Sequence, residues 1–173
     1  MYYCATYPSP VGALTLCSDG ENIVGLWIEG QRYFMQGIYN CTQAQSLPML
    51  KAAAAWLDRY FEGKNPDISS LPLKPSGSEF RQRVWKLLCK IPYGTTASYG
   101  KIAKALESCG GRVSARAVGG AVAHNPISII IPCHRVVGAD GNITGYAGGI
   151  ETKLSLLRHE GSDISGLKIP KNT

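Results

Sequence analysis

A short segment of the chain brings a thiol, an imidazole and a guanidinium together, because Cys133, His134 and Arg135 follow one another within the apolar residues 129–137. A working cysteine needs a nearby base or positive charge, since the thiolate is the nucleophile. The proline before the cysteine biases the preceding residue toward extended geometry. We therefore expect the thiol where a strand-like run ends and a turn or short helix begins. A buried cysteine with only a packing role remains the alternative for this pair taken alone.

Positive charge is concentrated in the C-terminal part of the chain. The 173 residues carry a net charge of +6, yet residues 1–77 hold five Lys or Arg against six Asp or Glu, and residues 78–173 hold thirteen against six. A basic region favours a polyanionic partner, and nucleic acid is the commonest one. A basic surface that serves only solubility is the alternative on charge alone.

The composition argues against a membrane protein and a disulfide scaffold. No apolar run approaches the roughly 18 residues of a membrane span, and no signal-peptide pattern is present. We expect a soluble cytoplasmic protein that associates with the nucleoid when it binds DNA. The six cysteines are irregularly spaced and form no CxxC pair, so neither a zinc ribbon nor a disulfide framework is expected.

The chain is expected to fold as two α+β parts with different roles. Alternating apolar residues and turn signals predict a small antiparallel β-meander over residues 2–7, 13–17 and 23–28. Apolar residues then recur every three or four positions from 47 to 61, which predicts an amphipathic helix. Residues 64–77 are rich in Pro, Ser and Gly, so we place a linker there. It separates an N-terminal support domain, residues 1–77, from a mainly helical domain, residues 78–173.

The helical domain contains a predicted helix-turn-helix. Helices are expected from Ser78 to about 90, from Ser98 to about 106, and from near Ser114 to 123. The turn that joins the second and third of these helices contains glycines. Apart from Arg116, the third helix consists of Ala, Val and Gly, although two consecutive glycines cost roughly 1 kcal/mol each. A helix that reads the major groove would present long polar side chains. Close approach to the minor groove fits better, and tight helix packing is the alternative.

Six motifs, in order, resemble the O6-alkylguanine-DNA alkyltransferases. They are ASYG at 97–100, ARAVGGA at 115–121, NP at 125–126, IPCHRVV at 131–137, GYAGG at 145–149 and HEG at 159–161. Together they span nearly all of residues 78–161. The N-terminal part resembles the family only in its Ser-Pro-x-Gly-x-Leu hairpin and the helix that follows.

The resemblance implies direct-reversal DNA repair. The alkyl group of O6-alkylguanine, with O4-alkylthymine as a further candidate, would move to Cys133 after base flipping, and each molecule would react once. Similarity to the family also implies that a monomer binds double-stranded DNA through the minor groove. Glu160 would hold His134, which would accept the Cys133 proton through a water molecule. Asn125 would link the third helix to the active-site loop, and Tyr99 would crowd the phosphate of the flipped nucleotide.

By the same resemblance, Arg116 would fill the space that the flipped base leaves. The residues expected at the DNA are Arg116, Tyr99, Ala115, Ala117, Gly119, Gly120, Ala123 and Arg135. The guanine pocket would use the Tyr146 hydroxyl as donor to N3 and the Ala147 amide as donor to O6. The backbone carbonyls of Cys133 and Val136 would accept from the exocyclic amine.

Some relatives bind zinc in the N-terminal domain through cysteines and histidines. Residues 1–77 contain Cys4, Cys17 and Cys41 but no histidine, so we expect no metal, and no other cofactor.

Three other functions fit the sequence less well. A protein that binds the lesion without transfer should lack the acceptor cysteine, which is present here as Cys133. A transcription factor would need base-reading side chains on the third helix. A cysteine hydrolase would leave the basic domain and its helix of small residues unexplained.

Overall fold

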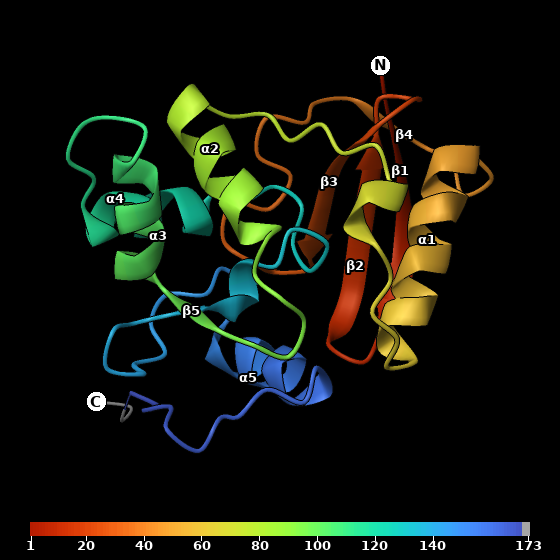
Figure 1. Cartoon of the computed structure of the whole chain (residues 1–173). Helices are drawn as coiled ribbons and strands as arrows, with labels where there is room; N and C mark the ends of the chain where they lie inside the picture. Colours follow the sequence, from red (N-terminus) through yellow and green to blue (C-terminus); the bar gives the residue numbers. More distant parts are fainter. Residues whose placement is uncertain (171–173) are drawn as a thin grey trace. The chain divides into compact units, whose positions relative to one another are not determined.

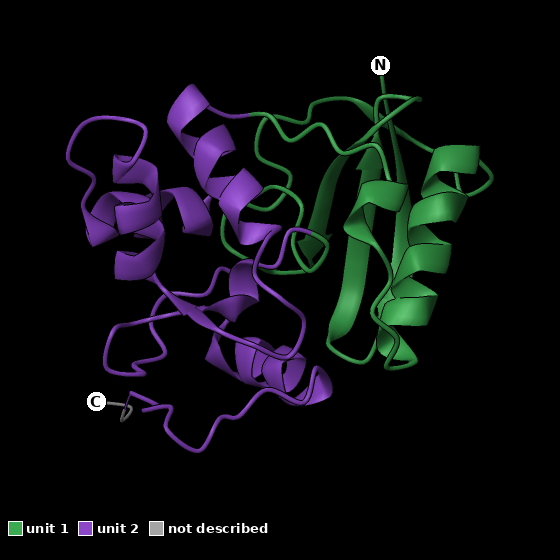
Figure 2. Ribbon diagram, viewed as in Figure 1, with its two compact units in different colours: residues 1–76, 126–130 green, residues 77–125, 131–173 purple. Residues whose placement is uncertain are grey.

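The computed structural model describes residues 1–170 and contains both strands and helices, which confirms the α+β class (Figure 1). The chain divides into two compact units (Figure 2). Unit 1 comprises residues 1–76 and 126–130, and unit 2 comprises residues 77–125 together with the chain from 131 onward. Within the described range, no helix is both long and apolar enough to cross a membrane.

Unit 1 is built on a four-stranded sheet in the order β3-β2-β1-β4. The three antiparallel strands confirm the predicted meander, and they are β1 (Tyr2–Ser9), β2 (Gly12–Ser18) and β3 (Ile23–Ile28). The short strand β4 (Cys41–Gln43) runs parallel to β1 and was not predicted, because three residues carry no recognisable alternation. The predicted amphipathic helix is α1 (Pro48–Phe61), and a short 3-10 helix, η1 (Ile68–Ser70), follows it.

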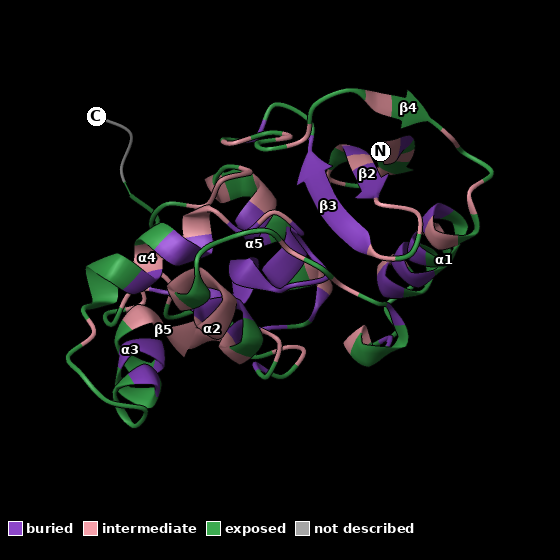
Figure 3. Ribbon diagram, turned by 90° about the horizontal axis from the view of Figure 1, so that it is seen from above, coloured by how far each residue is buried: buried purple, intermediate pink, exposed green. Residues whose placement is uncertain are grey.

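Strand β3 is buried along its whole length (Figure 3), as its unbroken apolar sequence requires. Its free edge is occupied by a segment distant in sequence. The Leu26 amide donates to the Pro126 carbonyl at 2.9 Å, and the Ser128 amide donates to the Leu26 carbonyl at 2.8 Å. Residues 126–130 therefore belong to unit 1, whereas the sequence placed them with the C-terminal domain.

The cysteines of unit 1 are gathered, contrary to the expectation drawn from their spacing. Cys4 and Cys17 face each other across β1 and β2 and form a disulfide. Cys41 enters from β4, so the three sulfur atoms lie within 4.8 Å of one another. The expectation of no disulfide was wrong for this pair. The pairing depends on the register of the hairpin, since the spacing of cysteines alone does not reveal cross-strand partners.

Unit 2 is mainly helical. Its elements are α2 (Glu79–Leu88), β5 (Ala97–Ser98), α3 (Tyr99–Glu107), α4 (Ala115–Ala123), the 3-10 helix η2 (Cys133–Arg135), β6 (Val136–Val137) and α5 (Ile150–His159). The hydroxyls of Ser78, Ser98 and Ser114 cap α2, α3 and α4 by accepting a backbone N–H three residues on. These are the helix starts that the sequence predicted. Strands β5 and β6 pair in parallel and connect the helix-turn-helix to the segment that follows Cys133.

Helix α4 has one buried and one exposed face. Val118, Ala121 and Val122 are buried, and the indole N–H of Trp85 in α2 donates to the Ala121 carbonyl at 2.8 Å. Because buried donors need a partner, this bond fixes α4 against α2. The opposite face, which carries Arg116, is exposed.

Candidate active site

Cys133 is the first residue of η2 and is only 4% exposed. The preceding turn is held by two hydrogen bonds to the Ile131 carbonyl, one from the Cys133 amide at 2.8 Å and one from the Asn125 side-chain amide at 2.9 Å. Asn125 directly follows α4 and its cap residue, so it joins the exposed helix to the loop of the thiol, as predicted. The sequence also predicted the change from an extended run to a short helix at this point.

The environment of Cys133 keeps the resting group a thiol. Burial raises the pKa of the Cys133 thiol, and this effect outweighs a hydrogen bond from Asn125, the charge of Lys153 and a hydrogen bond from Tyr146, which all lower it. A thiol of this kind is a poor nucleophile until a base takes its proton. The structure therefore brings together the thiol, Asn125 and Tyr146, and leaves the chemistry to depend on a base.

His134 is placed to be that base. Its Nε2 lies 2.6 Å from Oε1 of Glu160, and both side chains are fully buried. Burial lowers the pKa of His134, so the imidazole is neutral near pH 7 despite the opposing pull of Glu160. Because Nε2 faces a carboxylate, we assign the ring proton to Nε2 and the lone pair to Nδ1. Nδ1 is buried and has no hydrogen-bond partner among residues 1–170.

Glu160 remains ionised inside the protein. Burial alone would raise the pKa of this carboxyl, but hydrogen bonds from His134 and Arg135, and the positive charge of Arg135, lower it to about 2. Arg135 binds it with two donors, Nε to Oε2 at 2.8 Å and Nη2 to Oε1 at 3.0 Å. The main-chain amide of Gly94 approaches Oε2 at 3.4 Å. A side chain at Gly94 would place its Cβ 2.9 Å from the Glu160 carbonyl oxygen, so the close approach requires glycine.

Arg135 does not lie at the surface, which corrects the expectation that it contacts DNA. It is 5% exposed, and its third donor, Nη1, binds the Ile91 carbonyl at 2.7 Å. Its guanidinium also lies over the ring of Tyr93, 5.6 Å from the centroid. The sequence could not distinguish these roles, because an arginine next to a nucleophile fits both. Its fork of donors is used internally, to hold Glu160 in place for His134.

A loop between β6 and α5 closes the other side of the site. The Tyr99 hydroxyl donates to the Thr144 carbonyl at 3.3 Å, which ties the start of α3 to this loop. Burial raises the pKa of Tyr99, so its hydroxyl keeps its proton. The loop carries Tyr146 and Ala147, both half-buried, and ends at Gly149, whose φ of +91° starts α5 from a conformation that favours glycine. Val136 and Cys133, the predicted carbonyl acceptors, lie in β6 and η2.

The exposed face of α4 consists of very small residues around one arginine. Ala115, Arg116, Ala117 and Gly120 are exposed, and Gly119 and Ala123 are half-buried (Figure 3). A Cβ at Gly120 would meet no atom within 4 Å, and a Cβ at Gly119 would make ordinary contact with the Tyr99 ring at 3.8 Å. Neither glycine is therefore required by packing inside the protein. The thin surface of α4 points to an external partner that approaches closely.

One buried residue near the thiol was missed from the sequence. Lys153 in α5 is 1% exposed, and its ammonium donates to the Val136 carbonyl at 2.5 Å. The available signal was its position four residues before Leu157, on the apolar face of the helix. A lysine on such a face usually packs its aliphatic stem against the core and extends its ammonium into solvent, so the pattern alone did not single out Lys153.

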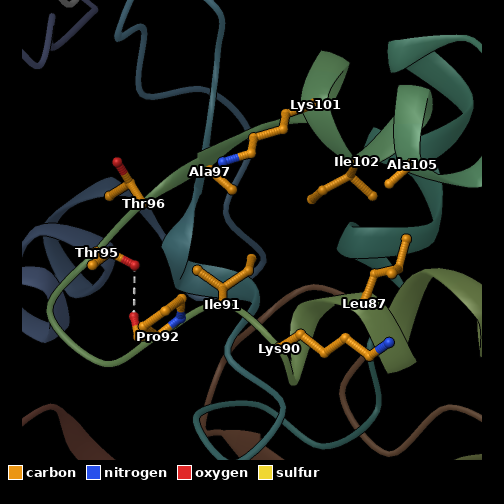
Figure 4. Close-up of a pocket in the computed structure, with 10 residues that line it drawn as sticks. All are labelled: Leu87, Lys90, Ile91, Pro92, Thr95, Thr96, Ala97, Lys101, Ile102 and Ala105. Carbon is orange, nitrogen blue, oxygen red and sulfur yellow. Dashed lines mark hydrogen bonds between the residues drawn. The ribbon is translucent and has the colours of Figure 1, made fainter.

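Unit 2 also has an open pocket of about 370 Å³, lined in part by Ile91, whose carbonyl binds Arg135 (Figure 4). Its floor is apolar, with Ile91 at the centre, and a hydrogen bond from the Thr95 hydroxyl to the Pro92 carbonyl crosses its edge. The residues that line it include none of those predicted for alkyl transfer or DNA contact. We therefore assign it no part in the chemistry.

Comparisons with known proteins agree with this arrangement. Residues 79–162 match the family model described as 6-O-methylguanine DNA methyltransferase, DNA binding domain, and residues 2–75 match the ribonuclease-like domain of the same family. A methylated-DNA–protein-cysteine methyltransferase of Haemophilus influenzae is 42% identical over 158 residues, which are 91% of this chain and 86% of the relative. The relative of the same name from Mycobacterium leprae is 42% identical over 163 residues, covering 92% of this chain and 93% of its own.

Solved structures show the same similarity. The crystal structure of Mycobacterium tuberculosis OGT in complex with DNA has a TM-score of 0.80 and 42% identity, with 92% of both chains covered. The structure of the Mycobacterium tuberculosis O6-methylguanine methyltransferase has a TM-score of 0.78 and 40% identity, with 93% of both chains covered. Since the two family models account for nearly the whole sequence and the relatives align with most of it, this chain belongs to the 6-O-methylguanine DNA methyltransferase family.

Proposed function

We propose that this protein repairs DNA by transferring the alkyl group of O6-alkylguanine to the sulfur of its own Cys133. The observation that carries this proposal is the buried Cys133 beside the His134–Glu160 pair, whose Nε2 to Oε1 distance is 2.6 Å. A bond forms between Sγ and the alkyl carbon, and the bond from that carbon to O6 breaks. The thiol loses its proton and guanine gains one, so the balance requires no cofactor. The thioether is stable, and each chain reacts once.

The proton leaves Cys133 through His134. The neutral imidazole presents the lone pair of Nδ1, while Nε2–H is held by the Glu160 carboxylate. When Nδ1 takes the proton through a water molecule, the ionised Glu160 stabilises the imidazolium that forms. Arg135 keeps this carboxylate ionised and oriented through its two donors. Both Glu160 and Arg135 are thus positioning residues, and His134 is the base.

The leaving guanine would be stabilised by donors aimed at its developing charge. We assign the Tyr146 hydroxyl to N3 and the Ala147 amide to O6, and the carbonyls of Cys133 and Val136 to the exocyclic amine. The hydroxyl of Tyr146 is buried, and a hydrogen bond from it lowers the pKa of the Cys133 thiol, which supports its place beside the reacting atoms.

Duplex DNA would approach the exposed face of α4. The base must leave the stack to reach a buried thiol, at a cost of a few kcal/mol. We assign Arg116 to the space that the base vacates and Tyr99 to the phosphate beside it. Binding in the minor groove is supported by the absence of bulk at Gly119 and Gly120, which internal packing does not explain. The relative from Mycobacterium tuberculosis was solved in complex with DNA.

The proposal is tested with a duplex oligonucleotide that contains one O6-methylguanine. Repair should stop at one lesion per protein chain, because Cys133 is consumed. The Cys133→Ala variant should bind the duplex but restore no guanine. Repair by this variant would overturn the assignment of the nucleophile, and binding without repair by the wild-type protein would favour lesion sensing instead.

A further inference from the structure

Three cysteines of unit 1 form a sulfur cluster that the proposed function does not use. Cys4 and Cys17 are joined as a disulfide across β1 and β2, and Cys41 in β4 is a free cysteine. The three sulfur atoms lie within 4.8 Å of one another. Cys41 pairs with Tyr2 in the parallel ladder of β1 and β4, so it faces the same side of the sheet as Cys4, two residues further along β1. A free thiol therefore lies beside a disulfide.

The disulfide is shielded from solvent, whereas Cys41 is partly accessible. Cys4 and Cys17 are both 0% exposed, and they pack together with Val24 and Trp27. Cys41 is half-buried and packs against this cluster from outside. A dissolved thiol reduces a disulfide only by direct attack on one of its two sulfur atoms. Such a thiol can approach Cys41 in the folded protein, but it meets neither sulfur of the buried pair.

The strand that carries Cys41 is the least firmly held of the sheet. β4 has three residues, lies at the edge next to β1, and follows Asn40, whose φ is +56°. An edge strand shares its ladder with one neighbour only. Because few bonds hold β4, its local opening costs less than that of the central strands. A small movement of β4 therefore suffices to bring the sulfur of Cys41 into contact with the disulfide.

We propose that Cys41 is a thiol–disulfide exchange site through which a low-molecular-weight thiol reduces the buried disulfide of Cys4 and Cys17. The Cys41 thiolate forms a bond to one of the two buried sulfur atoms, the bond between Cys4 and Cys17 breaks, and the sulfur that leaves takes a proton. The new disulfide includes the partly accessible Cys41. Two molecules of the soluble thiol then reduce it and leave as their own disulfide, so the protein gains two hydrogen atoms.

The exchange site connects the cross-link of unit 1 to the redox state of the surroundings. The disulfide joins β1 to β2 and constrains the unfolded chain, which stabilises the folded form. Its reduction lowers the stability of the sheet without a change at Cys133, which belongs to unit 2. This inference goes beyond alkyl transfer and does not depend on it.

The first test measures how fast dithiothreitol reduces the disulfide in the folded protein. The protein is oxidised with glutathione disulfide, mixed with dithiothreitol, quenched at intervals with N-ethylmaleimide, and mapped by peptide mass spectrometry. Cys41→Ser is compared with Cys89→Ser, which removes a half-buried free cysteine of unit 2. We expect Cys41→Ser to be reduced about tenfold more slowly or less, because the reagent must wait for the sheet to open and the adjacent thiol is lost. Cys89→Ser should follow the wild type.

The early products of the wild type should include a disulfide from Cys41 to Cys4 or Cys17. Equal rates of reduction for the wild type and Cys41→Ser would overturn the inference, since the reagent would then reach the buried pair without Cys41. A wild-type protein that keeps all six cysteines as thiols after the oxidation would overturn it as well.

A second test stands even if Cys41→Ser does not fold. Cys17→Ser removes the partner of Cys4 and leaves Cys41 beside it. When this variant is treated with glutathione disulfide, peptide mapping should find a disulfide between Cys4 and Cys41. If Cys4 stays a thiol, even where Cys41 carries glutathione, the two sulfur atoms do not meet and the exchange is refuted.

Discussion

The substitution Gly120→Ala separates the stability of α4 from its binding to DNA. A Cβ at this position meets no atom within 4 Å, so the methyl group fits the free protein. Replacement of glycine by alanine inside a helix stabilises it by about 1 kcal/mol, and for a protein of this size that raises Tm by roughly 2–4 °C. On the exposed face, the same methyl would lie between the helix and the DNA. Overpacking a close contact costs about 1–3 kcal/mol, which corresponds to a roughly five- to 150-fold weaker interaction.

The assay pairs thermal unfolding with single-turnover repair on a methylated duplex, and uses the free base O6-benzylguanine as a control substrate. Gly120→Ala should unfold at a higher temperature, react more slowly with the duplex, and react with the free base at the wild-type rate. If the variant is more stable and repairs the duplex as fast as the wild type, α4 does not approach DNA closely. If it is less stable, the glycine has an internal role that the structure does not show.

Three further predictions concern Arg116, the stability of the protein at low pH, and the buried Lys153. Arg116→Ala should slow repair of the duplex roughly tenfold or more and leave reaction with the free base unchanged; equal losses would remove Arg116 from base flipping. His134 and Glu160 bind fewer protons when folded, so stability measured in urea should fall as pH drops below 6.5 and again from 4.5 toward 2. Glu160→Gln should reduce the second fall, to which Asp19, whose pKa is also lowered to about 2, contributes. A flat profile would contradict the buried pair. Burial lowers the pKa of Lys153 to about 8, so Lys153→Met at pH 7 removes a buried charge that destabilises the folded protein by about 3 kcal/mol. The same substitution leaves the Val136 carbonyl without its hydrogen bond, which costs about 1–3 kcal/mol and offsets most of that gain in stability. Its Tm should therefore lie within a few degrees of wild type, and a far larger fall would show that the hydrogen bond dominates.

Local signals were sufficient for much of the fold. Ser78, Ser98 and Ser114 each precede an apolar periodic run, and each accepts the hydrogen bond that starts a helix, because capping is decided by residues close in sequence. The hairpin of β1 and β2 followed in the same way from alternation around a turn. The disulfide between Cys4 and Cys17 did not, because it depends on which residues of two strands face each other.

The site shows the same division between local and distant information. Cys133 and His134 are adjacent in sequence, and the proline before them indicated the turn at which the thiol lies. The partner of Arg135 is Glu160, 25 residues further along the chain, and only the packing of α5 against η2 identifies it. The remaining differences between the predicted and the observed site are differences in burial. Arg135 was expected to contact DNA but is buried, and Lys153, which the sequence did not single out, is buried as well. The residues next to Arg135 contain no signal for its burial, and the one signal for Lys153 is its position on the apolar face of α5.

The central claim is that Cys133 is the acceptor of the alkyl group, and intact-protein mass spectrometry tests it directly. The protein is incubated with a duplex that contains one O6-methylguanine, weighed intact, and then mapped by peptide. We predict a gain of one methylene mass, about 14 Da for a thioether formed from a thiol, which saturates at one per chain and maps to Cys133. A methyl group on any other residue, or no gain in mass when the duplex is bound, would contradict the account.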